Sequence, residues 1–428
     1  MRNISILSDN PSGLTDSELF DAIAKSIAGI QISLKKVLLL PPDFTRFHSG
    51  AGKITAFLYD LLSPTCVVDI MPALGTHVAM TSDEIRAMFG KWIPLDRFIV
   101  HNWRTNVKKL GEIPADVVCE FSEGLFHEVI DVELNRRLLD PSYDLILSIG
   151  QVVPHEVAGM ANYSKNLFVG CGGSSMINAS HMLGAFYGIE RVLGRDFSPV
   201  RKAFDYAETH FISQLPLQYV LTVTTAPAGD IQTHGLFIGR KRLLFERAVA
   251  LSQQKNITFV DRPLQKVIVN LDEAEFKSTW LGNKAIYRTR MAIADGGELI
   301  ILAPGVERFG EDESIGRLIE KYGYCGREKI LSLIQSERDL QENLSAAAHL
   351  IHGSSDGRFS IAYCAKKISG DLVRKVGYRY IPFCEAVQKY DPRAMVDGFN
   401  TLPDGETIYY ISNPAIGLWA EREKLFRE

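Results

Sequence analysis

The chain lacks the marks of several large protein classes. Its six cysteines are scattered with no CxxC pair, which favours reduced thiols over a disulfide framework. Its apolar runs are strand-length, far short of the about 20 residues that a membrane-spanning helix needs. Residues 1–13 are mixed and polar, without the basic, apolar and small-residue order of a secretory signal. We therefore expect a cytoplasmic protein with no membrane partner.

The chain is also poor in signals for binding nucleic acids or nucleotides. The formal net charge is −4, and no basic stripe or arginine-rich tail occurs, so no nucleic-acid partner is expected. Neither a GxGxxG nor a Walker motif is present. What is present is an ordinary globular balance of 46% hydrophobic and 23% charged residues. A length of 428 residues exceeds one ordinary core and predicts two domains.

Three apolar segments of the first half are each followed by a polar loop. They lie at Lys35–Asp43, Cys66–His77 and Tyr143–His155, with helical spacing at 50–62 and a capping-box signature opening 81–90. Continuous apolar runs are typical of buried parallel strands. Ligands of open α/β sheets collect at the carboxyl ends of such strands. The sequence therefore predicts an α/β fold with mostly parallel sheets and a site in these loops.

The second half predicts a further α/β unit. A shift in composition at 253–263 leads into it, so we expect an N-terminal α/β domain at 1–262 and a C-terminal α/β domain at 263–428. The elements expected there are strands at 264–272, 294–305 and 358–365 and a helix at 337–353.

The first two polar loops carry a carboxylate, a guanidinium and an imidazole. Arg46 of the DFTR segment can grip a carboxylate in a bidentate fork, and Asp43 can orient it or a ligand hydroxyl. An ion pair that only stabilises the loop explains these two residues equally well. His77, in the next loop, is a candidate proton carrier, although a lone histidine is more often structural.

The segment from Pro154 to His181 is richer in chemistry. It places His155, Lys165 and His181 at spacings of ten and sixteen residues, and these are side chains that move protons, form covalent links and hold metals. Desolvation in its loop could make Lys165 nucleophilic. Gly172 and Gly173 could let backbone amides approach a phosphate, or could simply form a tight turn into a helix.

Two further pairs lie in the second half. Trp280 and Lys284 are four residues apart, so on one helix they would share a face suited to an anionic or polar substrate. Ordinary packing of the tryptophan explains the spacing equally well. His349 and His352 have a spacing that can chelate a metal, but no acidic or cysteine partner lies nearby.

Taken together, these motifs resemble the nickel-pincer lactate racemase family. That family shows DxTR, a histidine in a Gly-x-His loop, PH, a lysine ten residues on and a histidine sixteen further. The same order and spacing occur here, and an aromatic-x-x-x-Lys precedes a Gly-Gly turn and a strand. The resemblance spans roughly residues 35 to 305.

The resemblance implies a two-domain protein with an interdomain active-site cleft that racemises or epimerises a small-molecule 2-hydroxy acid. It implies a nickel-pincer nucleotide (nickel pyridinium-3,5-bisthiocarboxylic acid mononucleotide), built by cofactor-maturation proteins, that exchanges hydride with the substrate. The implied roles are His77 and His155 as alternating proton carriers, Arg46, Trp280 and Lys284 as substrate contacts, Asp43, Thr45, Lys165, Gly172 and Gly173 as cofactor contacts with Lys165 the covalent tether, and His181 as the nickel ligand.

Departures from the family pattern bear on the substrate. Asn162–Ser164 stand where a Gly-Gly-Arg type of turn is expected, and Trp280–Leu281 stand where the lactate enzyme resembles Tyr–Gln. The segment His101–Arg104 and the pair of histidines at 349 and 352 indicate a different branch. Loss of the glutamine favours larger acids, such as sugar acids, over lactate.

Two other interpretations stay open at this point. One is a zinc-dependent hydrolase or lyase with His77, His155 and His181 as direct ligands. The other is a non-catalytic protein that binds carboxylates through Arg46 and Lys284. A homo-oligomer also stays open.

Overall fold

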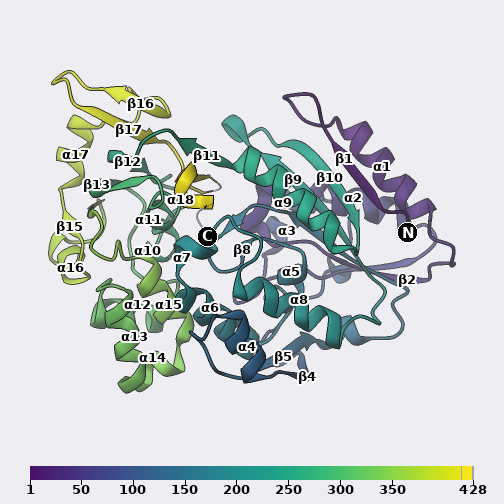
Figure 1. Cartoon of the computed structure of the whole chain (residues 1–428). Coiled ribbons are helices and arrows are strands. Elements are labelled where there is room, and N and C mark those ends of the chain that lie inside the picture. Colours follow the sequence, from purple (N-terminus) through teal and green to yellow (C-terminus); the bar gives the residue numbers. More distant parts are fainter. Residues whose placement is uncertain (416, 427–428) are drawn as a thin grey trace. The chain divides into compact units, whose positions relative to one another are not determined.

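The computed structural model describes residues 1–415 and 417–426, and these divide into two compact units (Figure 1). The first comprises Met1–Ser180 and Leu193–Asn256, and the second comprises His181–Val192 and Ile257–Glu428. Both are α/β with mostly parallel sheets, which confirms the predicted fold class. The short segment 181–192 groups with the second unit although the first unit flanks it in sequence, which sequence reasoning did not anticipate.

The sheet of the first unit is parallel where the polar loops leave it. Its order is β1 (Ile4–Leu7), β10 (Gln232–Gly239), β9 (Leu217–Thr225), β6 (Leu145–Gln151), β2 (Lys36–Leu40) and β3 (Val67–Ile70). Strands β9, β6, β2 and β3 are mutually parallel, and β10 and β1 are antiparallel additions at one edge. The carboxyl ends of β2, β3 and β6 therefore meet at one edge, as their apolar sequences predict.

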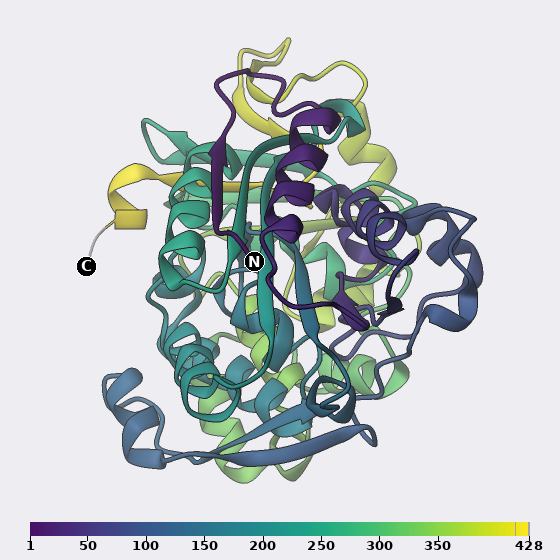
Figure 2. The same ribbon diagram turned by 90° about the vertical axis from the view of Figure 1, so that its right-hand side faces the viewer.

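Helices cover both faces of this sheet. Apolar side chains of α1, α2 and α3 form a common core with alternate residues of the strands, while α9 packs on β9 and β10 (Figures 1 and 2). Thr81 caps α3 with the expected capping box, so that prediction is confirmed. In Figure 2 the purple helix α1 lies over the strands and the blue hairpin β4–β5 runs along the lower side of the unit. The bounds are α1 (Asp16–Ala28), α2 (Ala51–Leu62), α3 (Ser82–Phe89), β4 (Val107–Ile113), α4 (Ala115–Phe121), β5 (Ile130–Asn135), α8 (Pro199–Phe211) and α9 (Arg242–Asn256).

The chemistry-bearing segment forms a small hairpin and two helices. Strands β7 (Pro154–His155) and β8 (Gly159–Met160) pair antiparallel, and α5 (Ser164–Phe168) follows them. Helix α6 (Ser174–Tyr187) begins in the first unit and ends in the segment that groups with the second, which also holds α7 (Ile189–Val192).

The second unit contains another largely parallel sheet. Its order is β15 (Arg379–Tyr380), β14 (Ser360–Ala365), β13 (Ile293–Ala303), β12 (Leu264–Asn270), β17 (Thr407–Ile411) and β16 (Gly398–Thr401), with only β16 antiparallel to its neighbour. A separate parallel pair joins β11 (Ile257–Val260) and β18 (Leu418–Glu421). The strands predicted at 264–272, 294–305 and 358–365 are confirmed as β12, β13 and β14.

One helix predicted in this unit is wrong in its continuity. The segment 337–353 forms α14 (Arg338–Glu342) and α15 (Leu344–His352), because Asn343 leaves helical geometry and caps α15 by accepting from Ala346 N. The stretch that carries Trp280 and Lys284 forms α10 (Thr279–Gly282) and α11 (Lys284–Tyr287), which meet at Asn283. The remaining helices are α12 (Glu313–Tyr322), α13 (Arg327–Ser336), α16 (Gly370–Lys375), α17 (Phe383–Lys389) and α18 (Arg422–Phe426).

Among the described residues, no helix is both long enough and apolar enough to span a bilayer.

Candidate active site in the loops of the first unit

Asp43 organises the first polar loop. It follows β2 and forms the N-cap of the helical turn η1 (Phe44–Ser49), where one carboxylate oxygen accepts from Thr45 N at 3.2 Å and from Thr45 Oγ1 at 2.5 Å. The side chain is buried. Thr45 therefore supports Asp43 in this structure.

The second oxygen of Asp43 binds His77 from the next loop. The distance from Asp43 Oδ2 to His77 Nδ1 is 2.6 Å. Burial alone would raise the pKa of Asp43, but the hydrogen bond and charge of His77, with Thr45 and Arg46, hold that pKa below its usual value. A carboxylate accepts only, so in the neutral ring Nδ1 carries the proton and Nε2 carries the lone pair. This pair has the geometry of an oriented general base.

His155 has the opposite arrangement of its ring nitrogens. Val157 N donates to His155 Nδ1 at 3.1 Å, so Nδ1 is an acceptor and the neutral ring carries its proton on Nε2. The side chain is buried in the β7–β8 hairpin. The neutral His155 ring thus carries its proton on the nitrogen where the neutral His77 ring carries its lone pair.

Lys165 lies on α5 close to the first loop. Burial is the main reason that its pKa falls to about 8, and the charges of Arg46 and Arg201 lower it further, against opposing effects of Glu156 and Asp43. Near pH 8 a large fraction of the amine is therefore neutral and nucleophilic. Charged residues of the loop that holds Asp43 thus also shift the pKa of the lysine that is predicted to be the tether.

Asn166, the residue after Lys165, fixes the position of α5 on the sheet. Asn166 Nδ2 donates to Leu40 O at 3.2 Å and to Ser148 Oγ at 2.9 Å. These acceptors belong to β2 and β6, so the short helix is tied to the carboxyl end of β2 and to the middle of β6.

The glycine-rich turn after α5 is densely packed. A Cβ on Gly172 would lie 1.9 Å from Phe168 O, and one on Gly173 would lie 2.2 Å from Glu133 Oε2. Glu133 also accepts from Ser175 N at 3.0 Å, which places a carboxylate at the start of α6. Packing alone therefore explains both glycines, and their contact with a cofactor stays a prediction.

His101 fixes the same turn, a role that sequence reasoning did not assign. Asn135 Nδ2 donates to its Nδ1 at 2.8 Å, and its Nε2 then donates to Gly172 O at 3.1 Å. Arg137 N donates to Asn135 Oδ1, which sets the orientation of that amide. Burial lowers the pKa of His101 to about 4 despite the Gly172 carbonyl, so the ring is neutral.

The remaining candidates belong to the second unit. His181 is partly buried on α6. Trp280 stacks on His349, with ring centroids 4.3 Å apart, and His349 Nε2 lies 3.0 Å from Tyr324 Oη. Lys284 Nζ lies 5.8 Å from the ring of Phe276. His349 thus stacks on Trp280, a contact that its spacing of three residues from His352 does not predict.

No group of three or more His, Cys, Asp or Glu side chains able to hold a metal is found in residues 1–415 and 417–426.

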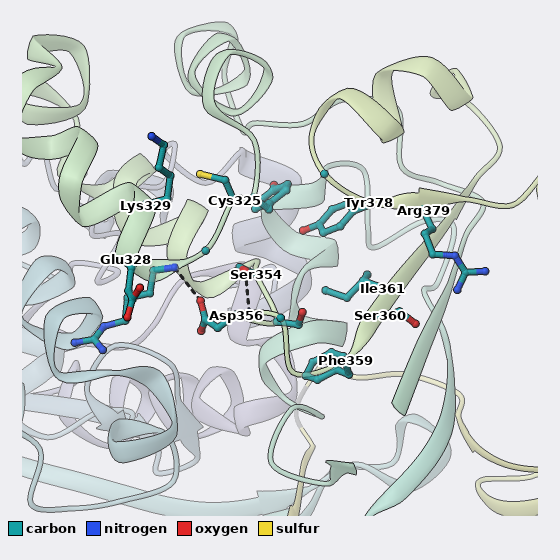
Figure 3. Close-up of a pocket in the computed structure, with 16 residues that line it drawn as sticks. Cys325, Glu328, Lys329, Ser354, Asp356, Phe359, Ser360, Ile361, Tyr378 and Arg379 are labelled. Carbon is teal, nitrogen blue, oxygen red and sulfur yellow. Dashed lines mark hydrogen bonds between the residues drawn. The ribbon is translucent and has the colours of Figure 1, made fainter. Parts of the chain in front are cut away.

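A cavity of about 830 Å³ also lies in the second unit (Figure 3). It opens at the amino end of β14, beside Ser360, whereas ligands of α/β sheets collect at carboxyl ends. Asp356 forms part of the cavity wall. Its Oδ1 accepts from Arg327 N at 2.8 Å, and its own N–H donates to Ser354 Oγ at 2.9 Å. None of the predicted site residues lines it.

The fold and the loops define an α/β protein that gathers a carboxylate–imidazole pair and a low-pKa amine at the carboxyl ends of parallel strands. Residues 21–191 match the family model of the lactate racemase N-terminal domain. This match confirms the resemblance to the lactate racemase family that the motifs predict.

Solved structures agree with this fold. A Thermotoga maritima protein is 23% identical, with a TM-score of 0.82, over 97% of this chain and 100% of that one. The lactate racemase apoprotein from Thermoanaerobacterium thermosaccharolyticum is 17% identical, with a TM-score of 0.70, over 98% of this chain and 100% of that one. No curated protein sequence matches the chain. The matched model describes a racemase domain, and the likeness to the two solved structures shows the fold.

Proposed function

We propose that the protein racemises or epimerises a 2-hydroxy acid with a nickel-pincer nucleotide tethered at Lys165. The observation that carries this proposal is the Lys165 amine, with a pKa near 8, beside the loop of the Asp43–His77 pair. A neutral amine can form a covalent link to a cofactor, and imidazole is a ligand that nickel accepts. The residues of the chain therefore fit such a group.

Each predicted site residue keeps a proposed role. Lys165 would be the tether and His181 the nickel ligand, while Arg46 and Lys284 would hold carboxylate and hydroxyl oxygens. The other proposed contacts are Trp280 for the substrate and Asp43, Thr45, Gly172 and Gly173 for the cofactor. For Asp43 we add a second role, the orientation of His77, because its Oδ2 bonds His77 Nδ1.

The two histidines would manage the hydroxyl proton of the substrate. When bound, the nickel-pincer nucleotide would supply a reversible acceptor for hydride from the substrate. His77 Nε2 accepts the hydroxyl proton, and Asp43 stabilises the imidazolium that forms. His155 Nε2–H donates to the substrate oxygen on the opposite side, and it can take a proton there only after Nδ1 releases Val157 N. Alternation of the two bases thus needs a local rearrangement at His155.

The substrate is proposed to be larger than lactate, such as a sugar acid. Trp280 and Leu281 replace the Tyr–Gln of the lactate enzyme, and the stacked Trp280–His349 pair offers a broad aromatic surface. Such surfaces suit the C–H faces of polyhydroxylated chains better than a single methyl group.

The test is production of the protein together with the cofactor-maturation proteins, followed by intact-mass and metal analysis. We expect an adduct on Lys165 and about one nickel per chain, with Lys165→Arg as the control that lacks the adduct. The loaded protein is then screened against chiral 2-hydroxy acids for loss of optical purity and exchange of the C2 hydrogen.

Three results would contradict the proposal. Unmodified Lys165 without nickel under these conditions would reject the tether. Zinc content with activity retained in Lys165→Ala would instead support a metal hydrolase or lyase. Stabilisation by hydroxy acids without C2 exchange in loaded protein would support a carboxylate-binding protein.

A further inference from the structure

The turn that precedes Lys165 has an unusual backbone. Asn162 and Tyr163 are consecutive non-glycine residues with φ of +63° and +56°. Left-handed conformations are unfavourable for residues with a Cβ and persist only where the surroundings enforce them. Asn162 Oδ1 accepts from Tyr163 N at 2.7 Å, which supports only the middle of the turn. Something else must hold its two ends.

Arg201 contacts the turn at three points. This residue of α8 is 1% exposed. Its Nη2 donates to Met160 O at 2.6 Å and to Asn162 O at 3.3 Å, and its Nη1 donates to Ser164 Oγ at 2.8 Å. The planar guanidinium fork is suited to fixing several acceptors at once. The turn contains no arginine of its own, so α8 supplies the cation that spans it.

A charged network fixes Arg201 and Ser164 in turn. Ser164 Oγ donates to Asp205 Oδ1 at 2.9 Å, and Asp205 Oδ2 accepts from Arg242 Nε at 2.9 Å. Arg242 also binds Asp196 with both terminal nitrogens, at 2.9 and 2.6 Å. The positive charge of Arg201 thus reaches a carboxylate through one hydroxyl, which makes Ser164 part of the linkage.

Aromatic rings close the same site. The Arg201 guanidinium lies 4.6 Å from the ring of Phe245, and Tyr163 stacks on that ring with centroids 4.8 Å apart. Tyr163 Oη donates to Arg240 O at 3.1 Å. The side chain of the strained residue and the cation that fixes the turn therefore share one support on α9.

We propose that Arg201 is a positioning residue for the tether lysine: it holds the turn 162–164 so that Lys165 presents its amine to the loop of Asp43 and Arg46. This inference rests on the proposed function of Lys165 as the cofactor tether. Arg201 touches neither substrate nor cofactor in this role. Arg201 lowers the pKa of the Lys165 amine in two ways. It keeps the surroundings of the amine closely packed, and it adds positive charge near the amine.

The test measures the Lys165 amine in the protein without cofactor. Limiting acetic anhydride labels neutral amines, and peptide mass spectrometry gives the labelling of Lys165 between pH 6.5 and 11. The charged groups that act on this amine are Arg46, Glu156, Arg201 and Asp43. We expect a wild-type midpoint near pH 8 that rises by about half a unit in Arg201→Lys and by one unit or more in Arg201→Met.

Arg240→Lys is the matched control. The Arg240 guanidinium binds the carbonyls of Ile212, Ser213 and Leu215 and the carboxylate of Glu208. Only its backbone oxygen, which the substitution leaves in place, contacts the turn 162–164, through Tyr163 Oη. We expect the labelling midpoint of Lys165 to stay unchanged in this variant. A loss of stability alone would affect both Arg201→Lys and Arg240→Lys. It would not move the labelling midpoint of Lys165 at a temperature where both variants are folded.

Two further measurements keep the inference testable. Amide hydrogen exchange of wild type should show strong protection at residues 161–165, and Arg201→Lys should lose it at least tenfold. Co-production with the maturation proteins should give at least tenfold less Lys165 adduct in Arg201→Lys than in wild type. An unchanged midpoint in folded Arg201→Lys and Arg201→Met, or weak wild-type protection, would overturn the inference. Absence of the adduct in wild type would contradict the proposed function, while labelling and exchange would still decide the role of Arg201.

Discussion

At the scale of single residues, the site depends on which ring nitrogen carries a proton. Asp43 makes His77 a proton acceptor at Nε2, and the Val157 amide makes His155 a proton donor at Nε2. Two histidines that the motif order cannot distinguish are thus different in the folded chain. The difference follows from one carboxylate and one backbone N–H.

Replacement of Asp43 tests this assignment. Asp43→Asn removes the charge that stabilises the His77 imidazolium, and we expect kcat of the loaded enzyme to fall about a hundredfold or more. Asp60→Asn is the control, since this exposed carboxylate on α2 only accepts from Trp92 Nε1. The measurement is the rate of racemisation on the best substrate of the screen. Equal loss in both variants, or no loss in Asp43→Asn, would contradict an orienting role.

At the scale of elements, the turn into α6 is held by groups from other elements. His101, Asn135 and Glu133 all bind this turn, and Asn135 and Glu133 belong to β5. The turn is thus a built structure whose glycines satisfy close packing.

His101 gives this element a pH dependence. Its pKa is about 4 in the folded chain and about 6.5 when unfolded, so between these values only the unfolded chain binds the proton. Stability is therefore full above pH 6.5 and falls as the pH drops toward 4, by up to roughly 3 kcal/mol. Urea unfolding at pH 7.5, 6 and 5 measures the slope. His101→Gln, which does not titrate, should show a shallower slope, and identical slopes would refute the assignment.

At the scale of the whole molecule, the chain passes between its two units more often than a simple boundary suggests. Segment 181–192 groups with the second unit and brings Glu190 to it. Glu190 Oε1 accepts from Arg290 Nε at 2.9 Å and from Arg358 Nη1 at 2.6 Å. Arg290 is buried, so this early glutamate neutralises cations of the later unit. A functional boundary at 262/263 stays a prediction.

The stability of the second unit should depend on Glu190. Glu190→Gln leaves the buried Arg290 with less compensation, and we expect a loss of about 2 kcal/mol in the free energy of unfolding. Glu313→Gln breaks an exposed pair with Arg317 and should cost less than about 0.5 kcal/mol. Urea titration followed by fluorescence compares the two variants. Equal losses would show that Glu190 has only a surface role.

Local patterns of the sequence determined a large part of this protein. The apolar runs before Asp43, His77 and His155 predicted parallel strands ending in polar loops, and Thr81 predicted its capping box, because burial and capping depend on residues close in the chain. The order and spacing of the motifs predicted the lactate racemase-like family. Continuity of the helix at 337–353 was predicted wrongly, because Asn343 leaves helical backbone geometry, which periodicity does not register.

Only the tertiary structure decided how those loops cooperate. The Asp43–His77 bond, the Arg201 contacts with the turn before Lys165 and the contacts of Glu190 join residues 34 to 168 positions apart. No periodicity or motif encodes such pairs, since they depend on which strands are neighbours in the sheet. The sequence by itself therefore determined which chemical groups are available and on which loops. The fold decided which of them share a proton, a charge or a strained turn.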